Sequence, residues 1–166
     1  MKYKIIAFVV YFLPFFFVTE LTLYLLFVLG GLAGMVLLIL DELIFYQYYN
    51  ENQLKENQVT QLNTLEDKNE LKTPFLATRS VLFVAVLIPL SFFIFTSTGS
   101  TLGIGLVMSL FLGIILEMWQ YRDNQKLFNE RFWSLVKKKL DLNQIKIVMV
   151  SLFAYFLFLS LLFFFT

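Results

Sequence analysis

The sequence contains no cysteine and no histidine. Their absence excludes disulfides, thiol redox chemistry, iron–sulfur clusters and haem bound through Cys or His, and it removes the usual zinc ligands. It also removes the commonest general base and the Ser–His and Cys–His nucleophile pairs. We therefore expect no cofactor and no enzymatic activity, and any metal site would need carboxylates and carbonyls, which suit Mg, Ca or Mn.

Charged residues are also scarce, at 15% of the chain, whereas hydrophobic residues make up 59% and the mean hydropathy is +0.76. This composition is typical of membrane proteins. Thirteen basic residues nearly balance twelve acidic ones, and the net charge of +1 gives no argument for a nucleic-acid partner. Because most of the chain lies in apolar runs, we expect a single domain, residues 1–166, whose partner is the lipid bilayer.

The apolar residues form long blocks separated by short polar segments. They predict an all-α polytopic integral membrane protein with five transmembrane helices, at approximately residues 4–19, 21–41, 75–96, 102–119 and 146–165. The third and fourth form a hairpin around the uncharged turn 96–101. Arg79 and Glu117 each lie about 19 residues from the midpoint of this turn, or roughly 28 Å along a helix, which is close to the thickness of a bilayer core. Both charges should therefore reach the same membrane surface.

The first apolar run is short and contains Pro14, which should kink it. It resembles a signal peptide in length, but no small-residue cleavage site follows, and an uncleaved span is the better interpretation. Glu20 separates it from the next run. A single helix over residues 5–40 would be about 54 Å long with a carboxylate at its middle, so two spans with a tight turn are favoured.

Two segments should lie outside the bilayer core. Residues 47–73 are rich in Asn, Gln, Glu and Lys, and we interpret them as a cytosolic loop with marginal helix. Residues 124–141 predict a basic amphipathic helix that lies flat among the lipid headgroups, because Phe128, Phe132 and nearby apolar residues share one face.

The distribution of charge predicts the topology. If the N-terminus is cytoplasmic, all thirteen Lys and Arg residues fall on the cytoplasmic side and the C-terminus lies outside. A four-span alternative would leave Lys2 and Lys4 outside. An inner bacterial membrane is the expected location. The run Lys137, Lys138 and Lys139 has two interpretations, an anchor for anionic lipids and a simple topology determinant.

Small residues mark two candidate helix-packing faces. Gly105, Ser109 and Gly113 follow one another at intervals of four on the fourth span, and Gly30 and Gly34 have the same spacing on the second. Such residues let helices approach closely, because packing must drive association in lipid. The stripe indicates either intramolecular packing, with Gly30 and Gly34 as a candidate partner, or a pore, substrate path or oligomer seam.

A candidate cluster of charges should lie at one depth near the inner surface: Asp41, Glu42, Arg79, Glu117, Arg122 and Asp123. Arg79 is expected to pair with Glu117 or with Asp41, since ionisable groups at a membrane boundary pair or line a wet cavity. The pairing indicates a structural clamp. A carboxylate site for a cation or proton and simple exposure at the headgroups are the alternatives.

These features favour a non-catalytic scaffold or subunit of a membrane complex that acts through helix packing. A small oligomeric transporter or channel using the inner-face carboxylates is the alternative. A membrane-protein partner favours the scaffold or subunit, whereas a homo-oligomer favours the transporter or channel. Adjacent Asp41 and Glu42 do not form the spaced carboxylate array that a lipid phosphotransferase needs.

Overall fold

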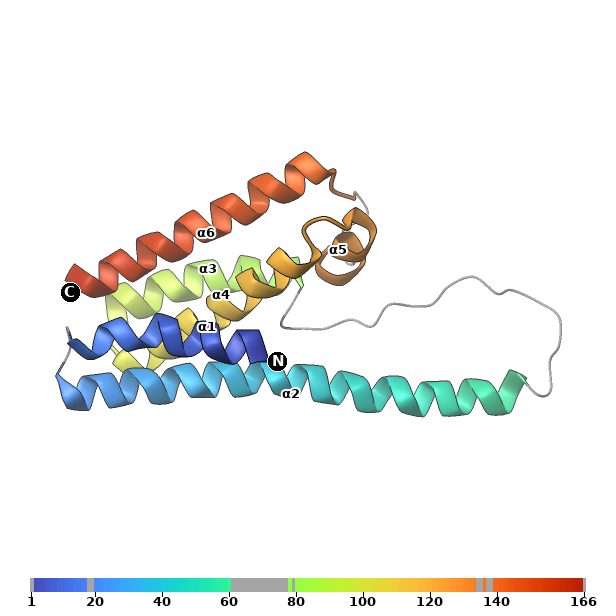
Figure 1. Cartoon of the computed structure of the whole chain (residues 1–166), viewed down its shortest axis with the longest axis horizontal. Helices are drawn as coiled ribbons and strands as arrows, with labels where there is room; N and C mark the ends of the chain where they lie inside the picture. The colour runs from blue at the N-terminus through green and yellow to red at the C-terminus, as the bar shows by residue number, and fades with distance from the viewer. Residues whose placement is uncertain are drawn as a thin grey trace.

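The computed structural model describes residues 2–17, 20–60, 78, 80–133, 136 and 139–165, and within these residues the chain is helical with no strand (Figure 1). The elements in chain order are α1 (Lys2–Phe12), the 3₁₀ helix η1 (Leu13–Phe17), α2 (Leu21–Thr60), α3 (Val81–Phe93), the π-helical turn η3 (Ile94–Thr98), α4 (Thr101–Tyr121), α5 (Gln125–Phe132) and α6 (Leu142–Phe165).

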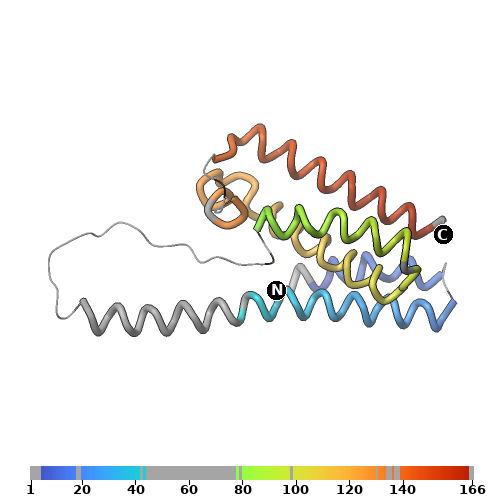
Figure 2. Tube along the Cα trace, turned by 180° about the vertical axis from the view of Figure 1, so that it is seen from behind, coloured from blue at the N-terminus to red at the C-terminus, as the bar shows by residue number. Residues whose placement is uncertain are grey.

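Three stretches in the described residues are long and apolar enough to cross a membrane: Leu21–Asp41 of α2, Thr101–Tyr121, and Leu142–Phe164 of α6. Ile5–Phe17 and Val81–Ser97 are shorter apolar helical stretches. Figures 1 and 2 show all five running between the same two ends of the bundle. The C-terminus, the α1–α2 connection and the α3–α4 turn lie at one end, and α5 lies at the other.

Helix α4 is the centre of the bundle. In its most apolar stretch 56% of the residues are buried, whereas the corresponding shares in α2 and α6 are 22% and 17%. Its side chains at Val107, Met108, Phe111 and Ile114 are wholly buried. The other helices therefore pack around α4 and turn large apolar side chains outward.

Proline breaks the first apolar stretch as expected. The α-helix ends at Phe12 and the chain continues as 3₁₀ helix through Pro14, because proline has no N–H for the helical ladder and its ring crowds the preceding turn. The 3₁₀ segment directs Phe15 inward against Phe27 of α2 and Phe163 of α6, with ring centroids 5.0 and 5.3 Å apart.

The α3–α4 hairpin has a local explanation. Ser80 caps α3 by accepting a hydrogen bond from the Phe83 amide at 3.2 Å. Gly99 ends the outgoing helix at φ +54, where a side chain would be strained. Ser100 then caps α4 by accepting from the Gly103 amide at 3.3 Å. The first residues of the predicted third span, 75–77, lie outside the described residues.

The prediction of a loop over residues 47–73 is corrected in its first part, because α2 continues to Thr60. Residues 61–73 lie outside the described residues. The segment from Glu42 to Thr60 contains no Gly or Pro, and nine of its nineteen residues are Gln, Glu, Lys or Leu, which are good helix formers. Since the apolar half of α2 is already helical, extension needs no new nucleus. Figure 1 shows this second half extending beyond the other helices.

The predicted helix over residues 124–141 is also corrected. Helix α5 ends at Phe132, and Phe128 and Phe132 are wholly buried within the protein. The face of α5 that carries these two side chains therefore packs within the protein and is not available to lipid. The buried amide of Asn129 binds the backbone of Leu140, eleven positions along the chain, whereas a continuous helix would hold these two residues roughly 16 Å apart.

Candidate functional site

Glycines bring the backbones of α2 and α4 into direct contact. A Cβ added at Gly30 would lie under 3.0 Å from the carbonyl oxygen of Leu102, and one at Gly105 would lie equally close to the carbonyl of Phe27. A Cβ at Gly34 would lie 2.6 Å from the carbonyl oxygen of Leu106. No side chain fits at these positions unless the helices move apart, which makes the α2–α4 seam a fixed element of the bundle.

The other two small residues lie along the same seam. Ser109 is buried, and its Cβ and Oγ would lie 3.1 Å from a Cβ added at Gly34. Gly113 faces a methyl group of Leu38 on α2. All five small residues singled out in the sequence therefore lie between α2 and α4, and none of them faces a described cavity.

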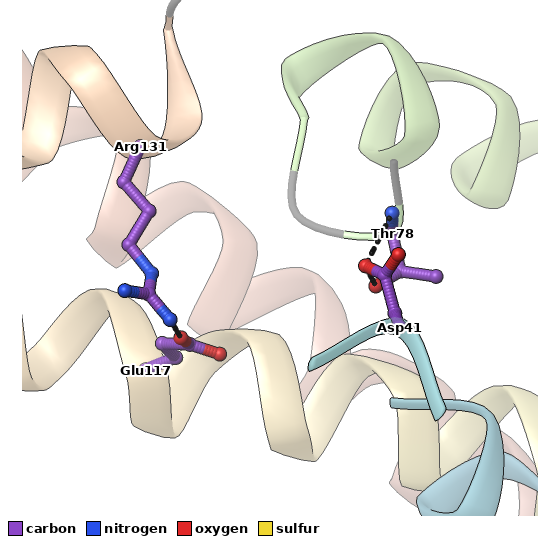
Figure 3. Close-up of polar contacts among 4 residues, drawn as sticks. All are labelled: Asp41, Thr78, Glu117 and Arg131. Carbon is purple, nitrogen blue, oxygen red and sulfur yellow. Dashed lines mark hydrogen bonds and ion pairs between the residues drawn. The ribbon is translucent and has the colours of Figure 1, made fainter. Parts of the chain in front are cut away.

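A buried ion pair joins the end of α4 to α5 (Figure 3). The Arg131 guanidinium donates to Glu117 Oε1 at 2.5 Å, and the Glu117 side chain is only 3% exposed. Arg131 also lies over the ring of Tyr121, 4.9 Å from its centroid. The pair compensates a carboxylate that the close packing of α4 has removed from solvent.

Arg131 was not among the residues selected from the sequence. It lies 14 positions after Glu117, beyond the tight connection Arg122–Asn124 that turns α5 back against α4. A basic residue roughly one helical hairpin after an acidic residue in an apolar helix could have indicated this ion pair. The sequence around Arg131 did not distinguish it from the neighbouring basic residues.

Asp41 makes the second polar contact in Figure 3. Its Oδ2 accepts hydrogen bonds from both the amide and the hydroxyl of Thr78, the amide at 3.1 Å. Thr78 is buried just before α3 begins. Asp41 therefore ties the point where α2 leaves the bundle to the start of α3, and both functional groups of Thr78 are used for this purpose.

The candidate charge cluster does not form one site in the described residues. Arg122 pairs with its neighbour Asp123 at 3.3 Å, and the two side chains are 41% and 85% exposed, so this contact contributes little. Arg79 and the side chain of Glu42 lie outside the described residues, and with them the predicted pairing of Arg79. The described charges thus make three separate local contacts.

Hydroxyl groups connect α6 to two other helices. Tyr155 lies 2.7 Å from Ser91 Oγ and donates to the Ile88 carbonyl of α3 at 3.1 Å. Tyr11 of α1 lies 2.8 Å from Ser160 Oγ. Sequence reasoning missed both contacts, because a serine or tyrosine in an apolar run shows no partner until the helices are placed side by side.

Two side chains of α5 bind the backbone of Leu140, shortly before α6 begins. Asn129 donates to the Leu140 carbonyl at 2.9 Å and accepts from the Leu140 amide at 2.8 Å. Gln125 donates to the same carbonyl at 2.9 Å. Nearby Lys139 is exposed, while Lys137 and Lys138 lie outside the described residues.

Chemically, these contacts position helices. The described residues contain no group of three or more His, Cys, Asp or Glu side chains placed to hold a metal ion. The buried carboxylate is matched by a guanidinium, and the buried amide and hydroxyls bind backbone or one another. The arrangement can hold a fixed bundle and present its surfaces to a partner.

Comparison of the chain with protein-family models, with curated proteins and with solved structures finds no match.

Proposed function

We propose that the chain is a polytopic integral membrane protein with five spans. The shorter apolar stretches Ile5–Phe17 and Val81–Ser97 run beside the three longer ones, between the same two ends of the bundle (Figures 1 and 2). Large apolar side chains remain exposed along α1, α2, α3 and α6, including Val10, Val86 and Val150 at 64%, 64% and 67%. An apolar surface of this extent is unfavourable in water and suited to lipid.

The orientation we propose places the N-terminus and α5 in the cytoplasm and the C-terminus outside, in a bacterial inner membrane. The positive-inside rule supports it, since this orientation assigns all thirteen Lys and Arg residues of the sequence to the cytoplasmic side. Reporters fused at Glu20, Gln61, Gly99 and Thr166 test it. Only the Gln61 reporter should be cytoplasmic, and a cytoplasmic Gly99 reporter would overturn the orientation.

Within that membrane the chain serves as a non-catalytic scaffold or subunit that acts through helix packing. The observation that carries this proposal is the continuation of α2 to Thr60, beyond the ends of the other helices (Figure 1). The α2–α4 seam and the Asp41–Thr78 contact fix the direction in which residues 42–60 of α2 leave the bundle. A rigid polar helix on a packed bundle offers a surface to a partner protein.

The test is the mass and composition of the complex after gentle extraction from its native membrane, with a tag on the N-terminus. A stoichiometric foreign protein supports the scaffold function, and it should be lost when residues 47–60 are deleted while the shortened chain still reaches the membrane. Recovery of the chain alone, or as a closed homo-oligomer, counts against it.

A transporter or channel is the second candidate, and the observation in its favour is that Glu117 is a buried carboxylate within the apolar helix α4. Flux through reconstituted vesicles separates the two functions. Glu117→Gln or Asp41→Asn should abolish flux in a transporter that still inserts, whereas equal flux in the wild type and both variants removes this candidate. The Arg131 counter-charge favours the scaffold, because it occupies the carboxylate that a transported cation would need.

A further inference from the structure

A groove separates α3 from α6 at the end of the bundle that carries α5. It encloses about 310 Å³ and is lined by apolar side chains that include Val84 of α3, Leu152 of α6 and Met118 of α4 behind them. Trp133, which follows α5, covers one end. Figures 1 and 2 show why the space exists: α6 and α3 draw apart toward α5.

The two ends of the groove differ in polarity. Its inner end is closed by Tyr155, whose hydroxyl is already engaged by Ser91 and by the Ile88 carbonyl. The other end of the lining, which we call the mouth, is at Val81, where α3 begins, so the positive end of that helix dipole lies there. Lys146 is exposed in the first turns of α6, immediately before the lining residue Ile147.

These features define what can occupy the groove. A helix with its side chains is about 10–12 Å across, too wide for a space at the lower end of the range for small-molecule sites. The lining is mostly apolar, with hydroxyl groups only at Ser151 and Tyr155, and such a lining suits a hydrocarbon chain. The positive charge at the mouth complements an anionic group carried on that chain.

We propose that the groove is a binding site for an anionic phospholipid of the surrounding membrane. One acyl chain lies between α3 and α6 as far as Tyr155, and the phosphate lies at the mouth near Lys146 and the first turn of α3. This inference rests on the membrane location proposed above, but it names a defined site for one lipid where the basic residues alone indicate only attraction to a charged surface.

Trp133 provides the test. The chain has two tryptophans, and Trp119 is 60% exposed and lies outside the groove. In a Trp119→Phe variant all tryptophan fluorescence reports on the groove. The protein is reconstituted in phosphatidylcholine vesicles, and quenching is compared for brominated phosphatidylglycerol and brominated phosphatidylcholine at equal low mole fractions.

The proposal expects brominated phosphatidylglycerol to associate with the Trp133 site at least about fivefold more strongly than phosphatidylcholine, the factor that one basic residue near an anionic lipid supplies. Lys146→Gln should remove most of this preference. Lys126→Gln is the matched control, since Lys126 is exposed on α5 and does not line the groove. It should keep the preference.

Filling the groove should abolish lipid access. Ser151→Phe places a ring in the groove, whereas Leu157→Phe places one on the outer face of the same helix, where Leu157 is 46% exposed. Specific quenching should be lost in the first variant and retained in the second. If Ser151→Phe loses its helical circular dichroism, Val148→Phe replaces it as the filling variant, and the Lys146→Gln result is unaffected.

Flotation of the vesicles distinguishes failure of this site from failure of the membrane location. A chain that does not float with the vesicles overturns both proposals. A chain that floats but is quenched equally by the two lipids, or equally in the wild type and the filled variant, overturns the lipid site alone.

Discussion

Removing Arg131 should leave the Glu117 carboxylate buried without its counter-charge. Breaking a buried ion pair from one side costs about 3–5 kcal/mol. The Glu117 side chain is 3% exposed and cannot recover its hydration without movement of α4, whereas Arg131 is 27% exposed. Water can therefore partly replace the guanidinium, and we expect Arg131→Met to lower the unfolding free energy by about 3 kcal/mol, the lower end of that range.

Unfolding in mixed micelles by titration with an anionic detergent, followed by circular dichroism, measures this change. Lys126→Met removes an exposed basic residue from the same helix and should change the free energy by less than about 0.5 kcal/mol. Combining Glu117→Leu with Arg131→Met should restore stability to within about 1 kcal/mol, because an apolar pair needs no compensation. Equal stability of Arg131→Met and Lys126→Met would refute the reasoning.

Three further contacts yield predictions of the same kind. Gly105→Ala should lower the unfolding free energy by about 2 kcal/mol because its Cβ would collide with the α2 backbone. In Gly103→Ala the new Cβ would meet side-chain atoms alone, the nearest being a methyl of Ile94 at 3.2 Å, and stability should stay within about 1 kcal/mol of wild type. Similar losses in the two variants would contradict the close packing of α2 on α4. Asn129→Ala should cost about 1–3 kcal/mol and speed hydrogen exchange in the backbone before α6, and unchanged exchange counts against its role. A double-mutant cycle between Tyr155→Phe and Ser91→Ala should give a coupling of about 0.6 kcal/mol, and zero coupling would show that the hydroxyls do not bind.

The local features of the fold follow from the sequence. Apolar runs predicted helices whose starts at Leu21 and Thr101 differ from expectation by no more than a residue. Pro14 and Gly99 mark the points where regular α-helix ends, Pro14 because it lacks an amide hydrogen and Gly99 because it adopts a positive φ. Such features depend on a residue and its near neighbours, which is why a single sequence was sufficient for them.

The polar segments were predicted less well, for a physical reason. Residues 47–60 have too few apolar side chains to specify a helix alone, and their helix is the continuation of one already formed. The sequence after Phe132 has a helical pattern, yet α5 ends at Phe132 and the Asn129 amide binds the backbone of Leu140, eleven positions along the chain. Local propensity is a weak preference that a single buried hydrogen-bonded contact can override.

The sequence by itself determined which segments are apolar helices, where they are interrupted, and that small residues lie on one face each of α2 and α4. Only the tertiary structure decided the partners: Arg131 for Glu117, Thr78 for Asp41, and the α2 backbone for the glycines of α4. Hydropathy and helical period describe one helix at a time, whereas an ion pair or a hydrogen bond between helices depends on their rotation and depth. Those are set by the packing of the whole bundle around α4.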